Sequence, residues 1–208
     1  MINEHTTLKE ISPPPCQCTK SYRMSPKGIS YCYFSTDVKT CFEECNTIAG
    51  DRILIGIFKA RRKLRILDLT IKNNIHIDLF SGDYDRSEES IRRFIFDYTS
   101  EISKSVDSNN EFDYLPTQVI AEYIRFKGYD GISYSSSKTK KMNYVFFYGP
   151  DYLSFPEMRP QGWNIYVDSV PSFLNAFSFE GAALCDVIDI DTHEVNIIKK
   201  TFNFNLCF

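Results

Sequence analysis

Four side chains on separate predicted elements have the chemical types that cleavage of a nucleotide requires. They are Arg23, Tyr33, Glu44 and Ser136. Arginine offers a planar, permanently charged fork that matches the oxygens of a pyrophosphate. A carboxylate stabilises the positive charge that develops on a ribose when its glycosidic bond breaks, or it orients the nucleophile. Tyrosine can stack on or hydrogen-bond a ribose, and serine can hydrogen-bond a hydroxyl or an amide. The set therefore predicts that the chain binds a dinucleotide and stabilises a glycosyl cation.

Each of these residues also has a more ordinary interpretation when it is considered alone. Arg23 would be a surface ion-pair residue, Tyr33 a strand aromatic and Glu44 a solvated helix residue. Ser136 would be a polar loop residue. Their joint order along the chain favours a shared site.

Each candidate lies on or beside an element that the pattern of apolar residues predicts. Pro26 and Gly28 shape a loop after Arg23 in which backbone N–H groups can face an anion. Glu44 lies on a predicted helix, and Ser136 follows a short predicted strand. The predicted elements are strand 29–35, helix 39–48 with an N-cap offered by Thr36-Asp37, β-rich runs 53–58 and 64–71, helix 87–102, a helix from Pro116 that Gly128 ends, strands 132–135 and 144–148, and a hairpin of 187–190 with 195–198. An α+β fold with a mixed or mostly antiparallel sheet and packed helices follows.

The composition is that of one folded domain with a small net charge. The 208 residues include 17 Phe and 13 Tyr, which supply enough apolar surface for one core. The net charge of −3 gives no reason to expect direct binding to nucleic acid or to a membrane. The first 15 residues are polar and proline-rich, unlike a signal peptide, and no apolar run reaches the length of a membrane span. We therefore expect a cytoplasmic location.

The seven cysteines are expected to be free thiols in a reducing compartment. Cys16 and Cys18 are separated by one residue, and Cys41 and Cys45 by three. Neither spacing matches the usual pairs of a structural zinc site, and no histidine lies nearby. We expect no metal.

A series of motifs in this chain resembles the RES domain family, which is named for its arginine, glutamate and serine. The resemblance covers roughly residues 12–150. The motifs are Arg23-Met24-Ser25-Pro26-x-Gly28-Ile29, Tyr33, Thr40 to Glu44, Leu64 to Leu69, Tyr114 to Ile124, Gly128 to Ile132, Tyr134-x-Ser136 and Asn143 to Phe147. The eleven-residue offset from Tyr33 favours Glu44 over its neighbour Glu43. Ser25 stands where an asparagine is common in the family, which leaves the contacts of the phosphate loop open.

The resemblance implies an ADP-ribosyltransferase-like fold that takes NAD as its substrate. Many members of this family are the toxin of a RES–Xre toxin–antitoxin pair. The implied reaction is cleavage of the nicotinamide–ribose bond by a glycohydrolase or a phosphorylase. In the implied site, Glu44 stabilises the cation, Arg23 holds phosphate, Tyr33 and Ser136 position the nicotinamide ribose, and Asn143 also binds the substrate. The implied protein partner is a small Xre-like DNA-binding antitoxin.

Two other functions stay open at this point. The same residues could serve a protein ADP-ribosyltransferase that uses NAD as its donor, or the fold could act as a non-catalytic binding or effector module. The expected organisation is an N-terminal arm or linker (1–20), a RES-like catalytic domain (21–150) and a C-terminal β-rich extension (151–208) packed on the same domain. That extension could complete the sheet, form a homodimer contact or cover the site.

Overall fold

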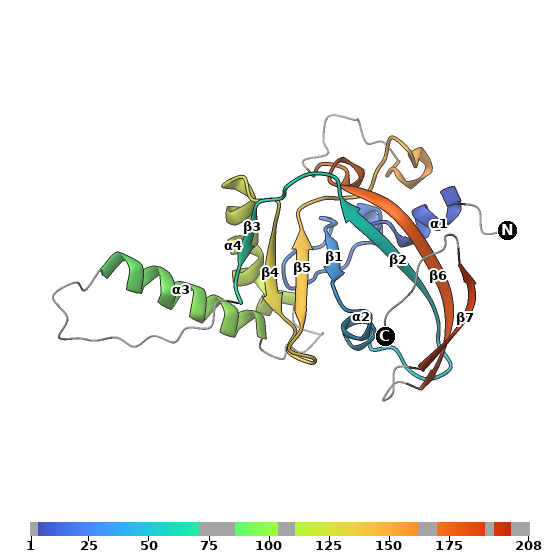
Figure 1. Ribbon diagram of the computed structural model, residues 1–208. Helices are drawn as coiled ribbons and strands as arrows, with labels where there is room; N and C mark the ends of the chain where they lie inside the picture. Colours follow the sequence, from blue (N-terminus) through green and yellow to red (C-terminus); the bar gives the residue numbers. More distant parts are fainter. Residues whose placement is uncertain (1–3, 71–85, 104–110, 162–169, 190–193, 201–208) are drawn as a thin grey trace.

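The computed structural model describes residues 4–70, 86–103, 111–161, 170–189 and 194–200, which form two β-sheets and several helices (Figure 1). The helices are α1 (Glu4–Ile11), α2 (Val38–Glu44), α3 (Arg86–Ser103) and α4 (Leu115–Phe126). The strands are β1 (Cys32–Ser35), β2 (Arg52–Ala60), β3 (Ile66–Asp68), β4 (Gly131–Ser135), β5 (Met142–Phe146), β6 (Phe177–Asp189) and β7 (Glu194–Lys200). The predicted α+β class is confirmed.

The first sheet has the strand order β1-β5-β4-β3. Its β3–β4 pair is parallel, and its other pairs are antiparallel, so the sheet is mixed as the sequence predicts. Because side chains alternate along a strand, residues opposite one another share a face. Val145 lies opposite both Tyr33 and Ile132, and two residues further along Asn143 lies opposite both Ser35 and Tyr134. These two rows therefore project from the same face.

That face of the first sheet packs against α3 and α4. Ile132 and Val145 are fully buried there, together with Ala121 and Ile124 of α4 and Tyr98 of α3. In Figure 1, α3 extends away from the sheets, and its C-terminal end lies beside α4. The burial of Tyr98 explains how this end of α3 is anchored.

The opposite face of the first sheet packs against a second, antiparallel sheet of order β2-β6-β7. Aromatic rings join the two sheets. Phe34 of β1 stacks on Phe58 of β2 with ring centroids 5.3 Å apart, and Phe146 of β5 meets Phe177 of β6 at 4.8 Å. The second sheet therefore supports the back of the first and leaves its helical face for α3 and α4.

The second sheet is built largely from the C-terminal part of the chain. The predicted pairing of 187–190 with 195–198 is confirmed, since Val187 lies opposite Val195 and Asp189 opposite Glu194. Residues 190–193, which contain most of the predicted hairpin loop, lie outside the described residues.

The helix that carries Glu44 is shorter than predicted. Of the two residues that the sequence offers as an N-cap, Asp37 is the cap, and its carboxylate accepts a 3.0 Å hydrogen bond from the backbone N–H of Thr40. The predicted helix over 39–48 ends at Glu44, because Asn46 has a left-handed φ of 51° that a helix cannot contain. Glu44 is consequently the last helical residue.

The first 20 residues, expected to be an arm or linker, contain α1 and a 3-10 turn at Cys16–Cys18. Ile11 packs over Gly56 of β2, where a Cβ would lie only 2.5 Å from the Cδ1 atom of Ile11. The backbone N–H of Cys16 donates to the hydroxyl of Tyr152 at 3.0 Å. The segment between α1 and β1 is therefore held against the body of the molecule at several points.

Candidate active site

The Glu44 carboxylate is held by two neutral donors from the first sheet. Ser136 Oγ and Asn143 Nδ2 each donate to the same oxygen, Oε1, at 2.7 Å. Among the described residues, none donates a hydrogen bond to the second oxygen, Oε2, and the Glu44 residue is exposed. The carboxylate thus has a defined orientation and an oxygen that can face a ligand.

Ser136 is oriented by the loop that follows β4. The residue is only 1% exposed, and its Oγ accepts the backbone N–H groups of Lys138 and Thr139, both at 3.2 Å. Because two amides donate to this oxygen, its own proton is directed to Glu44. The hydroxyls of Thr139 and Thr40 are 2.8 Å apart, which ties this loop to α2.

Tyr134 is a residue of this site to which the sequence analysis gave no role. It lies directly opposite Asn143 in the β4–β5 pair, so the two side chains share a sheet face. Burial raises the pKa of Tyr134 to about 12, with a further contribution from the negative charge of Glu44, while Arg23 and Asn143 oppose the rise. Tyr134 is therefore a neutral hydroxyl at physiological pH. Its place two residues before Ser136, in an alternating strand, was the signal that could have identified it.

Arg23 lies on a loop that the N-terminal turn of α4 holds in place. Thr117 Oγ1 donates to the carbonyl oxygen of Arg23, and Gln118 Nε2 donates to the carbonyl oxygen of Tyr22 at 2.8 Å. The guanidinium donates to the carbonyl oxygen of Glu101 at 3.2 Å and lies 5.9 Å from the centroid of the Tyr114 ring.

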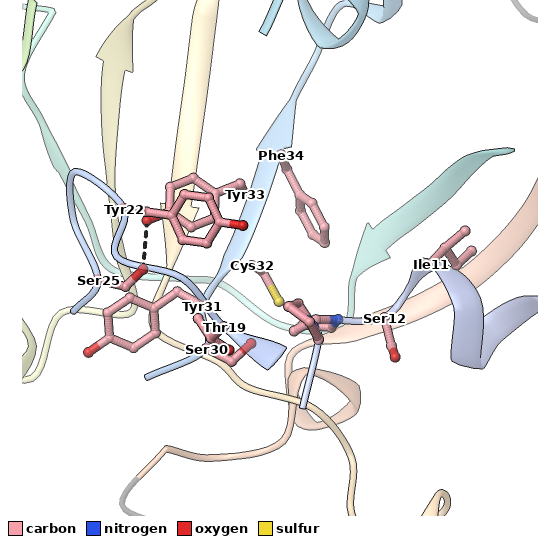
Figure 2. A pocket seen from close by; sticks show the side chains of 12 residues that line it. Ile11, Ser12, Thr19, Tyr22, Ser25, Ser30, Tyr31, Cys32, Tyr33 and Phe34 are labelled. Carbon is pink, nitrogen blue, oxygen red and sulfur yellow. Dashed lines mark hydrogen bonds between the residues drawn. The ribbon is translucent and has the colours of Figure 1, made fainter. Parts of the chain in front are cut away.

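Tyr33 lies on β1, with its hydroxyl 3.0 Å from Ser25 Oγ (Figure 2). Its ring contacts the Tyr22 ring at a centroid distance of 5.8 Å. Although 40% of the residue is exposed, its surroundings desolvate the hydroxyl and raise the pKa of Tyr33 above its ordinary value, and the hydrogen bond with Ser25 opposes that rise. Ser25 itself is fully buried, and its hydroxyl is directed to Tyr33.

The structure brings three of the predicted residues into direct contact, while Arg23 and Tyr33 make their described contacts elsewhere. Glu44, Ser136 and Asn143 are joined by hydrogen bonds, and with Tyr134 they form what we call the Glu44 cluster. Tyr33 projects from the same face of the first sheet as Tyr134 and Asn143, and Arg23 lies on the loop before β1. Glu43 is the alternative to Glu44. Its backbone carbonyl oxygen accepts a hydrogen bond from the ammonium group of Lys138.

The residues of the Glu44 cluster, with Arg23 and Tyr33, fall within residues 9–168, which match the family model of the RES domain. The chain belongs to the RES domain family. RES domains are known generally as NAD-related toxin domains, with enzymatic action on NAD. No curated protein and no solved structure matches the chain. The match begins in α1, so the RES domain here includes the segment that precedes β1.

Two further observations concern the described parts of this RES domain. No group of three or more His, Cys, Asp or Glu side chains is placed there to hold a metal ion, and the six cysteines in those parts are free thiols. No helix in the described ranges has the length and apolar character needed to cross a membrane.

Proposed function

We propose that this RES domain cleaves the nicotinamide–ribose bond of NAD and that Glu44 stabilises the resulting ribosyl cation. The observation that supports the proposal most strongly is the hydrogen bonding of Glu44. Its oxygen Oε1 is fixed by Ser136 and Asn143 at 2.7 Å each, while Oε2 faces no donor among the described residues. A carboxylate held in place by neutral groups keeps its full negative charge for a developing cation.

The bond that breaks joins C1′ of the ribose to the ring nitrogen of nicotinamide. The bonding electron pair leaves with that nitrogen, so the positively charged ring departs as a neutral base and needs no proton from a general acid. Positive charge then develops on C1′ and the ribose ring oxygen, where a carboxylate is stabilising. Water or phosphate adds to C1′, and an added water molecule loses one proton to the solvent.

The other residues bind and orient the substrate in this proposal. Arg23 holds the pyrophosphate by charge and by its planar fork. Tyr33 and Ser136 contact the nicotinamide ribose. Ser136 and Asn143 also orient Glu44, so their removal would weaken catalysis through the carboxylate as well as through substrate binding.

The test is to follow NAD by chromatography with purified protein and with the Glu44→Gln variant, in the presence and absence of phosphate. We expect the wild type to release nicotinamide and the variant to release very little. A requirement for phosphate would identify a phosphorylase, and its absence a hydrolase. Intact NAD after incubation with folded wild type, under both conditions, would contradict the proposal. A labelled protein band from labelled NAD would instead identify a protein ADP-ribosyltransferase.

The same proposal includes a protein inhibitor, since an enzyme that depletes NAD would arrest the cell that makes it. The family resemblance suggests an antitoxin of the Xre type. We expect such a protein to co-purify with this chain and to suppress NAD cleavage. A candidate that binds the chain but leaves nicotinamide release unchanged would contradict this part of the proposal.

A further inference from the structure

The loop that carries Arg23 contains a short turn closed by its own backbone. The N–H of Tyr22 donates to the carbonyl oxygen of Ser25 at 2.8 Å, and the N–H of Ser25 donates to the carbonyl oxygen of Tyr22 at 3.2 Å. Arg23 and Met24 lie between these two residues. Arg23 is therefore at the tip of a turn, which we call the Arg23 turn (22–25), and the direction of its side chain depends on what holds that turn.

Gln118 of α4 contacts both ends of the Arg23 turn. Its Nε2 atom donates to the carbonyl oxygen of Tyr22 at 2.8 Å and lies 3.4 Å from the carbonyl oxygen of Ser25. A third contact, with Ser21 Oγ at 2.9 Å, fixes the residue that precedes the turn. One side-chain amide thus links α4 to the chain on each side of Arg23.

Thr117 of α4 contacts the middle of the same turn. Its Oγ1 donates to the carbonyl oxygen of Arg23, and the carbonyl oxygen of Tyr114 also lies within its reach at 2.9 Å. The Arg23 guanidinium lies 5.9 Å from the centroid of the Tyr114 ring and donates to the carbonyl oxygen of Glu101, near the C-terminal end of α3, at 3.2 Å. The backbone and the side chain of Arg23 are therefore both held by the helical part of the domain.

Thr117 and Gln118 are polar side chains on the buried face of α4. They are only 2% and 5% exposed, and the other buried residues of that helix are Ala121 and Ile124. Burying a hydroxyl or an amide is unfavourable unless hydrogen bonds satisfy it, and an apolar side chain of the same shape would avoid that cost. Since the hydrogen bonds of this pair go to the Arg23 turn and its flanks, the two residues define the shape of that turn as well as filling space.

We propose that Gln118 and Thr117 are positioning residues, which set the direction in which Arg23 presents its guanidinium to the pyrophosphate. The inference rests on the proposed function, in which Arg23 holds that group. A guanidinium pairs with two phosphate oxygens only in a defined orientation, so a small rotation of the turn weakens binding without removing the charge. Neither positioning residue touches the substrate, and both act through Arg23.

The test uses two variants of nearly unchanged shape, Gln118→Met and Thr117→Val, and one that keeps the hydroxyl, Thr117→Ser. The measurements are kcat and KM for NAD, and calorimetric binding of ADP-ribose, which retains the pyrophosphate. We expect KM and the Kd of ADP-ribose to rise about tenfold in Gln118→Met and about threefold in Thr117→Val, with kcat within about twofold of wild type. Thr117→Ser should keep the wild-type values.

A matched control and a double variant separate positioning from a general loss of stability. The control is Thr99→Val in α3, whose hydroxyl contacts the carbonyl oxygens of Ile95 and Leu69, and we expect it to change neither constant. Arg23→Lys keeps a charge but lacks the planar fork. In that background Gln118→Met should cause a much smaller further loss of ADP-ribose binding, because it acts through the orientation of the fork.

The outcomes separate this inference from the proposed function. If wild type cleaves NAD but folded Gln118→Met and Thr117→Val keep its KM and its affinity for ADP-ribose, the positioning role is overturned and the proposed function stands. Fully multiplicative losses in the double variant, or an equal rise of KM in Thr99→Val, would also overturn it. Weaker ADP-ribose binding in the variants, in protein that leaves NAD intact, would support the positioning role and refute the cleavage reaction. Thr117→Val, which removes a single hydroxyl, decides the question if Gln118→Met does not fold.

Discussion

Two carboxylates of this RES domain, those of Glu44 and Asp130, are both fixed by hydrogen bonds, but in opposite ways. Glu44 receives two neutral donors on one oxygen and is exposed. Asp130 receives the guanidinium of Arg62 on both oxygens, at 2.6 and 3.2 Å, and the backbone N–H of Arg65 at 2.7 Å. The hydroxyl of Tyr148 also donates to it. Its side chain is only 15% exposed.

The difference separates a structural carboxylate from one that is suited to bind a ligand. Partial burial of Asp130 disfavours its charged form, but the donors outweigh that effect and hold its pKa below the ordinary value. Its charge is neutralised within the protein, at the junction where the chain enters β3. The donors around Glu44 are uncharged, so they orient the carboxylate and leave its charge for a substrate.

The largest effect is expected from Glu44→Gln, which keeps the shape of the side chain and removes its charge. Loss of one transition-state charge contact commonly lowers kcat by about 10²–10³, and we expect a loss of that size in NAD cleavage. The melting temperature should change little, because the side chain is exposed. Glu43→Gln is the matched control, and equal losses in both variants would remove the distinction between Glu44 and its neighbour.

For Asp130→Asn we expect the reverse, a loss of stability with little change in activity. Removing the charge leaves Arg62 without its ionic partner, and we expect unfolding in urea to show a loss of about 2 kcal/mol. NAD cleavage per folded molecule should stay close to the wild-type value. Asp186→Asn breaks an exposed ion pair with Arg52 and serves as the control, with a much smaller loss. A loss of activity in folded Asp130→Asn would contradict the structural role.

The stabilising effect of Asp130 is also expected to depend on pH. Because the pKa of Asp130 is lower in the folded state, its contribution is fully present above the unfolded pKa and is lost as pH falls through the folded pKa. The difference in unfolding free energy between wild type and Asp130→Asn should therefore shrink in acid. A difference that stays constant from neutral pH to below pH about 3 would contradict this linkage.

Smaller effects are expected at the two residues that orient Glu44. Ser136→Ala and Asn143→Ala each remove one donor to Oε1, and we expect each to lower kcat about tenfold. Because both act through the same oxygen, the double variant should lose less than the product of the single losses. Fully multiplicative losses, measured as kcat and KM for NAD, would show that the two residues act independently of Glu44.

Much of the secondary structure could be predicted, because it depends on contacts between residues that are close together in the sequence. The cap of α2 falls within the predicted pair Thr36-Asp37, because the side chain of Asp37 reaches a backbone N–H only three residues away. The strands near 132–135 and 144–148 were predicted from apolar runs and lie within a residue or two of β4 and β5. The helix over 39–48 was predicted too long, since apolar periodicity does not reveal the left-handed backbone at Asn46.

Long-range contacts could not be predicted in the same way. Tyr134 received no role in the sequence analysis because a tyrosine in a strand is usually a packing residue, and its contact with Asn143 depends on strand register. The buried hydroxyl of Ser30, which has no hydrogen-bond partner among the described residues, is a further example. Serine is common in loops, and a cavity beside Ser30 is lined by residues as far along the chain as Ile11 and Phe34.

The order of residue types along the chain was enough to indicate an arginine, a tyrosine, a glutamate and a serine for one site, since these types carry their chemistry wherever they lie. Which of two adjacent glutamates contacts Ser136 and Asn143 required the folded chain. Successive residues on a helix point about 100° apart, so the place of Glu44 on α2 directs it to the sheet. Hydrogen bonds across 92 and 99 residues of sequence arise from strand pairing, which no local pattern specifies.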